Sequence, residues 1–193
     1  MPRIDNDEFY LAALKKHGIC SGGLHWSSDA HQSIRFEKIL TLLGEDLQNN
    51  TLVDAGCGFG DFYSFLRRNS LHVKQYIGID SLTEMCKIAK EKTACEILHA
   101  DITKAQLPLA DYYICSGALN ILTPFETELF IRNCFESSKK GFVFNALYGD
   151  KKSDTYNYIN MQTIQSLAKR LHVKRVEFEE GYIEHDITVG FFK

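Results

Sequence analysis

The chain has 193 residues, of which 45% are hydrophobic and 24% are charged, which suffices for one domain with a full hydrophobic core. Its net charge is −3 and its isoelectric point is near 6.2, so it lacks the basic footprint of an avid nucleic-acid binder. The six cysteines form no C-x-x-C pair and no histidine pair stands at ligand spacing, so neither a zinc site nor a disulfide framework is indicated. Reduced thiols, a polar and acidic N-terminus and the lack of a membrane-length apolar run predict a cytoplasmic protein that has no signal peptide and no membrane partner.

The N-terminal residues predict helices that precede the core. Residues 5–17 carry an apolar pattern that ends at a glycine, which is typical of a short amphipathic helix. Residues 28–43 predict a longer helix, and the loop between the two holds His25 and Trp26. We therefore expect residues 1–45 to form a helical lid or flank, in which Trp26 either closes on a ligand or packs on a neighbouring helix.

Residues 46–193 predict a core in which strands alternate with helices. The expected strands cover residues 51–54, 73–79, 95–100, 111–116, 141–147, 173–181 and 186–193, and the expected helices cover residues 61–69, 82–92, 124–139 and 159–172. This alternation predicts a mostly parallel sheet with helices on both faces. The link 182–185 is too short for a parallel crossover, so the last two strands should form an antiparallel hairpin.

A glycine-rich turn follows the first expected strand. Gly56, Gly58 and Gly60 alternate there, and Asp54 stands two residues before the first of them. Glycines let the backbone adopt positive φ angles and approach a ligand closely, and the following helix start presents unpaired N–H groups. The turn therefore predicts a site for a nucleotide-like cofactor.

Two further acids end the next two expected strands. Asp80 lies twenty residues beyond Gly60, where a carboxylate can accept hydrogen bonds from both hydroxyls of a ribose, and Asp101 follows the third strand. Each acid could instead cap the helix or turn that follows it, a role that suits Asp61. Parallel strands bind ligands at their carboxyl ends, so the three strand ends together favour the cofactor interpretation.

These residues resemble the class I S-adenosylmethionine-dependent methyltransferases. The first motif of that family, D-x-G-x-G-x-G, is filled here by Asp54, Gly56, Gly58 and Gly60. The resemblance implies an α/β fold: a single doubly wound sheet of seven strands in the order 3-2-1-4-5-7-6, with the last strand antiparallel and helices on both faces. A dinucleotide dehydrogenase would instead supply a further helix and parallel strand.

The resemblance implies S-adenosylmethionine as the cofactor. Asp101 would then accept a hydrogen bond from the adenine amine while Ile102 covers the ring, and Arg35 would reach the methionine carboxylate. An ion pair between Arg35 and Glu37 or Glu45 is the alternative. We expect Cys57 to fill space rather than act as a nucleophile. The full set of expected cofactor contacts is Asp54, Ala55, Gly56, Cys57, Gly58, Gly60, Asp80, Ser81, Leu82, Asp101, Ile102, Ser116, Gly117 and Arg35.

The resemblance also places the transferable methyl group beside the end of the fourth strand, near residues 116–120. No Asn-Pro-Pro-Tyr run follows that strand, which leaves the acceptor chemistry open and favours a small molecule. The expected acceptor contacts are His25, Trp26, Asn120 and Tyr148. Methyl transfer mainly requires that donor and acceptor be held in line, so no catalytic residue is assigned.

Two alternatives to a small-molecule methyltransferase stay open. Basic residues at 139–140, 151–152, 169–170 and 174–175 could form an anion-binding face for a nucleic acid, a protein or another acidic substrate, or could simply form a solvated surface. The missing acceptor motif is equally consistent with a protein that binds the cofactor without catalysing its turnover.

Overall fold

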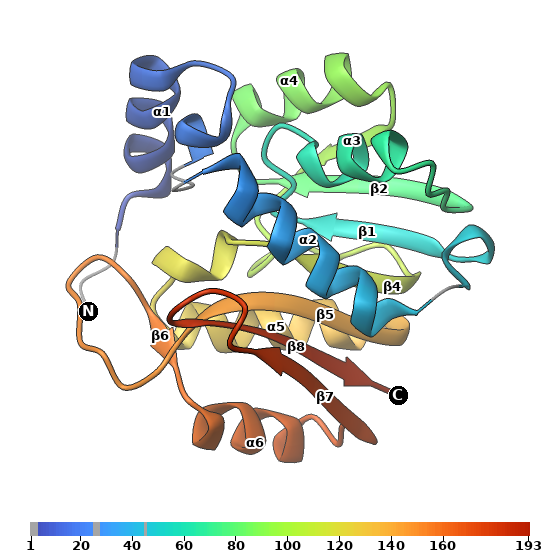
Figure 1. Cartoon of the computed structure of the whole chain (residues 1–193), viewed down its shortest axis with the longest axis vertical. Helices are drawn as coiled ribbons and strands as arrows, with labels where there is room; N and C mark the ends of the chain where they lie inside the picture. Colours follow the sequence, from blue (N-terminus) through green and yellow to red (C-terminus); the bar gives the residue numbers. More distant parts are fainter. Residues whose placement is uncertain (1–3, 25–27, 45) are drawn as a thin grey trace.

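The computed structural model describes residues 4–24, 28–44 and 46–193. An eight-stranded sheet forms its centre (Figure 1). The strands are β1 (Thr51–Ala55), β2 (Gln75–Asp80), β3 (Glu96–His99), β4 (Ala110–Cys115), β5 (Ser138–Tyr148), β6 (Tyr158–Ile159), β7 (Arg175–Glu180) and β8 (Asp186–Phe192).

The described residues also form six α-helices and three short 3₁₀ helices, and the first four of these elements in the chain precede β1. The α-helices are α1 (Asn6–His17), α2 (Asp29–Leu43), α3 (Asp61–Arg68), α4 (Thr83–Thr93), α5 (Pro124–Ser137) and α6 (Met161–Arg170), and the 3₁₀ helices are η1 (Ser21–Leu24), η2 (Asp46–Asn49) and η3 (Ala118–Ile121). Local sequence explains where two of them begin. Ser28 caps α2 by accepting the His31 N–H, and Thr123 and Glu126 form a reciprocal capping box at α5.

The strand order is β3-β2-β1-β4-β5-β8-β7, and β6 pairs with the end of β5. β8 is antiparallel to both β5 and β7, whereas all other pairs are parallel. The predicted fold class and strand order are confirmed once β6 is set aside. This two-residue strand was not predicted, because it is too short to carry a periodic pattern.

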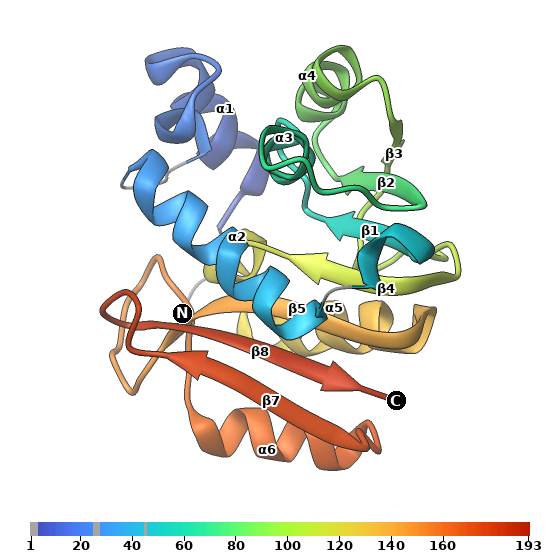
Figure 2. The ribbon, with the colours of Figure 1, turned by 45° about the vertical axis from the view of Figure 1, so that its right-hand side comes forward.

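Each face of the sheet buries one layer of helices. Helices α2 and α3 pack on one face, where Phe36 and Ile39 meet Leu52 and Val143. Helices α5 and α6 pack on the other face (Figure 1), and Figure 2 shows α2 and α3 in front of the sheet with α5 behind it. In the described part of the chain, no helix is both long enough and apolar enough to cross a bilayer.

The strand order reverses between β1 and β4, which are neighbours in the sheet. The chain leaves β1 toward α3 on one face and leaves β4 toward α5 on the other, so a crevice opens between the two loops. Helix α1 and the segment 149–157 both lie at this carboxyl edge of the sheet (Figure 1). The fold thus brings residues from both halves of the sequence to one edge.

The burial of Ile39 gives a test of the α2 layer. Ile39 is fully buried against the sheet, so Ile39→Ala should lower the free energy of unfolding by about 2–5 kcal/mol through lost burial and a residual cavity. Leu109 is 72% exposed, and Leu109→Ala should change stability by less than about 0.5 kcal/mol. Urea unfolding measures both variants, and equal losses would mean that α2 is not part of the core.

Candidate active site

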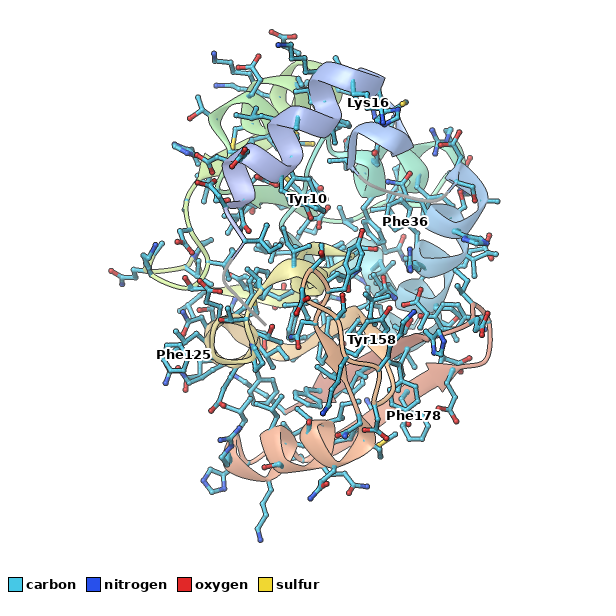
Figure 3. All side chains as sticks on the ribbon, turned by 90° about the vertical axis from the view of Figure 1, so that its left-hand side faces the viewer. Tyr10, Lys16, Phe36, Phe125, Tyr158 and Phe178 are labelled. Carbon is cyan, nitrogen blue, oxygen red and sulfur yellow. The ribbon has the colours of Figure 1, made fainter. Side chains whose placement is uncertain are left out.

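A cavity of about 320 Å³ opens at the carboxyl edge of the sheet. Its lining comes from the loops after β1, β2, β3 and β4, and also from α1, α2 and the segment before β6. Figure 3 looks onto this edge, with Tyr10 on the α1 side, Tyr158 on the β6 side and Phe36 on α2. This volume is within the range of small-molecule sites.

The glycine turn is bent back onto the end of β2. The N–H groups of Gly56 and Cys57 both donate to the carbonyl of Ile79, at 2.8 and 3.0 Å. Gly56, Gly58 and Gly60 all have positive φ angles, which side-chain-bearing residues rarely adopt. A Cβ on Gly56 would lie 2.5 Å from the Cβ of Ala118, so only glycine lets the β1 and β4 loops approach this closely.

Asp80 fastens the same turn through its carboxylate. One oxygen accepts the Gly58 N–H at 2.9 Å, and the other accepts the Leu82 N–H at 3.0 Å. Burial raises the pKa of Asp80, and the hydrogen bonds from Leu82 and Gly58 oppose that rise. Each carboxylate oxygen has more than one lone pair, so Asp80 can hold the turn and still accept a ligand hydroxyl.

Asp54 lines the cavity from the end of β1 and is buried at 3% exposure. The hydroxyl of Tyr76, on the neighbouring strand β2, donates to its carboxylate at 2.6 Å. Burial raises the pKa of Asp54 to about 7, although the Tyr76 hydrogen bond lowers it. Asp54 is therefore close to its titration point at neutral pH.

Asp101 has a more polar environment than the other two acids. Its carboxylate accepts from the N–H and the hydroxyl of Thr103, at 2.9 and 2.6 Å, and pairs with Lys104 at 2.7 Å. Partial burial raises its pKa, but the contacts with Lys104 and Thr103 outweigh it and hold the pKa below the usual range. Asp101 is thus a charged acceptor at the cavity, with Ile102 buried beside it.

Arg35 lines the cavity from α2 and is buried at 8% exposure. Its guanidinium forms an ion pair with Asp186 at the start of β8, and Glu45, one of the two acids that the sequence alternative named, lies outside the described residues. Burial raises the pKa of Asp186 to about 6, against the opposing charge of Arg35. The pair joins the helix α2 to the C-terminal hairpin across the mouth of the crevice.

Most of the expected cofactor residues line this one cavity. Ala55 and Gly60 are not among the described lining residues, because Ala55 belongs to the buried interior of β1 and Gly60 packs against α4. The cofactor-directed residues at the cavity are Asp54, Gly56, Cys57, Gly58, Asp80, Ser81, Leu82, Asp101, Ile102, Ser116, Gly117 and Arg35. Burial raises the pKa of Cys57, which suits a space-filling thiol.

The expected acceptor residues divide into three cases. Asn120 lines the cavity, and its side-chain oxygen accepts the Leu147 N–H at 3.2 Å. Tyr148 is not among the described lining residues, because it lies at the end of β5, where its N–H bonds to the carbonyl of His185. His25 and Trp26 lie outside the described residues.

Sequence reasoning did not assign several aromatic residues that line the cavity. Phe9 and Tyr10 come from α1, and Tyr156 and Tyr158 come from the segment before and into β6. The cluster of tyrosines between residues 148 and 158 was a usable signal for the second pair. Within the described residues, no group of three or more His, Cys, Asp or Glu side chains is arranged to hold a metal ion.

With this geometry in place, known families can be compared. Residues 52–141 match the family model of the methyltransferase domain. This segment is similar to a methyltransferase domain. The match spans β1 to the start of β5, which includes the glycine turn, Asp80 and Asp101. The resemblance to the class I methyltransferases is thereby confirmed for the domain and the fold.

Solved structures of methyltransferases share the fold at low sequence identity. Magnesium protoporphyrin IX methyltransferase from Synechocystis, with bound S-adenosylmethionine, matches 100% of this chain and 99% of its own at TM-score 0.72 and 12% identity. Human N-acetylserotonin methyltransferase with S-adenosylmethionine matches 98% of this chain and 60% of its own, at TM-score 0.68 and 15% identity. An S-adenosylmethionine-dependent methyltransferase from Archaeoglobus fulgidus matches 97% of this chain and 100% of its own, at TM-score 0.66 and 13% identity. Among curated protein sequences, none is significantly similar to this chain.

The close approach at Gly56 leads to a prediction with a matched control. Gly56 and Gly181 both have φ of +79°, but a Cβ would clash with Ala118 at Gly56 and would meet nothing within 4 Å at Gly181. Both alanine variants should lose about 1–2 kcal/mol of stability from the left-handed backbone. Only Gly56→Ala should also lose cofactor affinity, because the two loops must move apart. Calorimetric titration of both variants with S-adenosylmethionine measures the difference, and equal affinities of the two variants would contradict the prediction.

The buried carboxyl of Asp54 makes a second prediction, about pH. Its pKa is about 7 in the folded protein, above its ordinary value of 3.8, so between these values the folded state holds a proton that the unfolded state has lost. Stability should therefore fall as pH rises from about 4 to about 7. Asp54→Asn should flatten this fall, whereas Asp111→Asn, near the other end of β4, should preserve it. Urea unfolding at pH 5 and pH 8 tests this, and an unchanged slope in Asp54→Asn would refute it.

Proposed function

We propose that the protein transfers a methyl group from S-adenosylmethionine to a small-molecule acceptor. The observation that carries the proposal is the convergence of the glycine turn, Asp80 and Asp101 on one cavity at the carboxyl edge of the sheet. The methyltransferase domain over residues 52–141 supports the reaction type. The three solved methyltransferases that share this fold support the same chemistry.

The chemistry of the lining residues suits this cofactor. The backbone of Gly56 and Gly58 permits close approach of the methionine part, and Asp80 can accept from the ribose hydroxyls. Asp101 can accept from the adenine amine, with Ile102 covering the ring. S-adenosylmethionine supplies a methyl group on a positively charged sulfur, and the acidic side chains around the cavity favour that charge.

The charge of the cavity also supports a small, non-anionic acceptor. Asp54, Asp61, Asp80 and Asp101 line it, and the lysines that pair with two of them, Lys92 with Asp61 and Lys104 with Asp101, are not among the described lining residues. Among the described lining residues Arg35 is the one cationic side chain, and its charge is compensated by Asp186. A nucleic-acid backbone would meet repulsion here, because phosphate recognition relies on uncompensated lysine and arginine.

The protein's own residues have a positioning role in the reaction. In-line methyl transfer has a good leaving group, so holding acceptor and donor in near-attack geometry supplies most of the rate. Ser116 and Asn120 are placed to form the wall beside the reacting groups, and hydrogen bonds to Asn145 and Leu147 fix their side chains. Helix α1 and the segment before β6 lie over this edge and contribute to the walls of the cavity.

Calorimetry with S-adenosylmethionine, S-adenosylhomocysteine and NAD tests the cofactor. We expect binding of the first two, and Asp80→Ala should weaken it by about 1–3 kcal/mol through lost charge-assisted hydrogen bonds. Asp111→Ala is the matched control, since Asp111 also accepts a backbone N–H, from Thr51 at 2.8 Å, but does not line the cavity. NAD binding without a response to the other two ligands would overturn the proposal.

A further inference from the structure

The segment between β5 and β6 builds a second, different part of the cavity. Tyr156 and Tyr158 both line it, and the residue between them, Asn157, is buried on the opposite side of the chain. The Asn157 side chain donates to the hydroxyl of Thr127 on α5 at 2.9 Å, and its N–H donates to the carbonyl of Asn120 at 2.7 Å. Tyr156 and Tyr158 therefore present their side chains to the cavity, whereas Asn157 between them is directed toward α5.

This aromatic wall is preformed rather than loose. The hydroxyl of Ser153 accepts the N–H groups of Thr155 and Tyr156, at 3.2 and 3.0 Å. The side chain of Asn160 donates to Asp150 at 2.7 Å, which closes the base of the segment. These hydrogen bonds order the backbone that carries the two tyrosines, so the segment loses little backbone entropy when a ligand stacks on the rings.

Helix α1 supplies a facing wall from the other end of the sequence. Phe9 and Tyr10 line the cavity, and their rings contact each other edge to face at 5.3 Å (Figure 3 labels Tyr10 and Tyr158). Burial raises the pKa of Tyr10, and the nearby carboxylate of Asp80 contributes to the rise. Tyr10 therefore stands between two parts of the cavity. The acid-lined part is formed by Asp54, Asp80 and Asp101, and the aromatic part is formed by Phe9, Tyr10, Tyr156 and Tyr158.

The amide of Asn120 gives the aromatic part its polar character. Its oxygen accepts the Leu147 N–H, which fixes the orientation of the amide and leaves its NH₂ group as the donor that can serve a ligand. A donor hydrogen bond favours an oxygen that carries negative charge. The neighbouring lining residues Leu147, Tyr156 and Tyr158 bring no carboxylate, ammonium or guanidinium group to this part of the cavity.

On these grounds, and resting on the proposed function, we infer that the acceptor is an uncharged flat aromatic compound with a ring hydroxyl. Its ring lies against Tyr156 and Tyr158, and its oxygen accepts from the Asn120 NH₂ group. The hydroxyl proton passes to water, the oxygen bonds to the methyl carbon, and the carbon–sulfur bond breaks with its electron pair retained by sulfur. Asn120 favours the ionised oxygen and so promotes the attack.

Binding of 1-naphthol to protein saturated with S-adenosylhomocysteine tests the inference, with decahydro-1-naphthol as the saturated counterpart. We expect 1-naphthol to bind about tenfold more tightly, because only a flat ring can stack on the tyrosines. Tyr156→Leu and Tyr158→Leu should each weaken it about threefold to tenfold. Phe125→Leu, at a residue on α5 that is 70% exposed and does not line the cavity, should have no effect.

A fourth variant tests the donor at the end of the ring. Asn120→Asp keeps an oxygen for the Leu147 N–H but replaces the donor by a negative charge, so it should weaken 1-naphthol binding about tenfold. Affinity for S-adenosylhomocysteine should be retained in all four variants, which shows that each is folded. Equal binding of the two probes, or wild-type 1-naphthol binding in the tyrosine and Asn120 variants, would overturn the inference alone. Failure of the wild-type protein to bind S-adenosylhomocysteine would overturn the proposed function as well.

Discussion

The hydrogen bond from the Gly58 N–H to the carboxylate of Asp80 is the constraint on which the site depends. The turn after β1 contains three glycines, and such a chain segment is conformationally permissive on its own. Asp80 fixes it from the neighbouring strand, with its second oxygen occupied by Leu82. Burying this carboxylate costs free energy, as its raised pKa shows, and the two backbone donors offset part of that cost. The protein thus maintains a charged acceptor where a ligand would need one.

A second constraint acts on the opposite side of the crevice. The ion pair between Arg35 and Asp186 ties α2, which comes before the sheet in sequence, to β8, which is its last strand. Next to it, the side chain of Asn145 donates to Thr188 at 2.6 Å and accepts from Ser116 at 2.8 Å. A buried polar network of this kind is stable only when its members are satisfied, so it holds the β4, β5 and β8 ends in one arrangement. The mouth of the cavity is rigid on this side for that reason.

The fold was largely readable from sequence because its signals are local. Buried strands, helix caps and the short link before β8 each depend on a few neighbouring residues, and the predicted strand order is confirmed. The acid and glycine positions of the cavity were also predicted, because each of them stands at or just after the end of an expected strand. The hydrogen-bond partner of Asp54 was not predicted, because Tyr76 reaches its carboxylate only once β1 and β2 have paired. Arg35 was linked to acids nearby in sequence, whereas its observed partner is 151 residues away.

The same distinction explains why the two parts of the cavity differ in how well sequence describes them. The acid-lined part lies within residues 52–141, where the family model matches and where each side chain follows a strand end. The aromatic part joins α1 to the segment before β6, both outside that range, and its rings meet only in the folded chain. A motif can record the first part because the same cofactor imposes the same geometry. The second part is formed by the particular aromatic residues of this chain, so the acceptor must be deduced from their arrangement rather than from the motif.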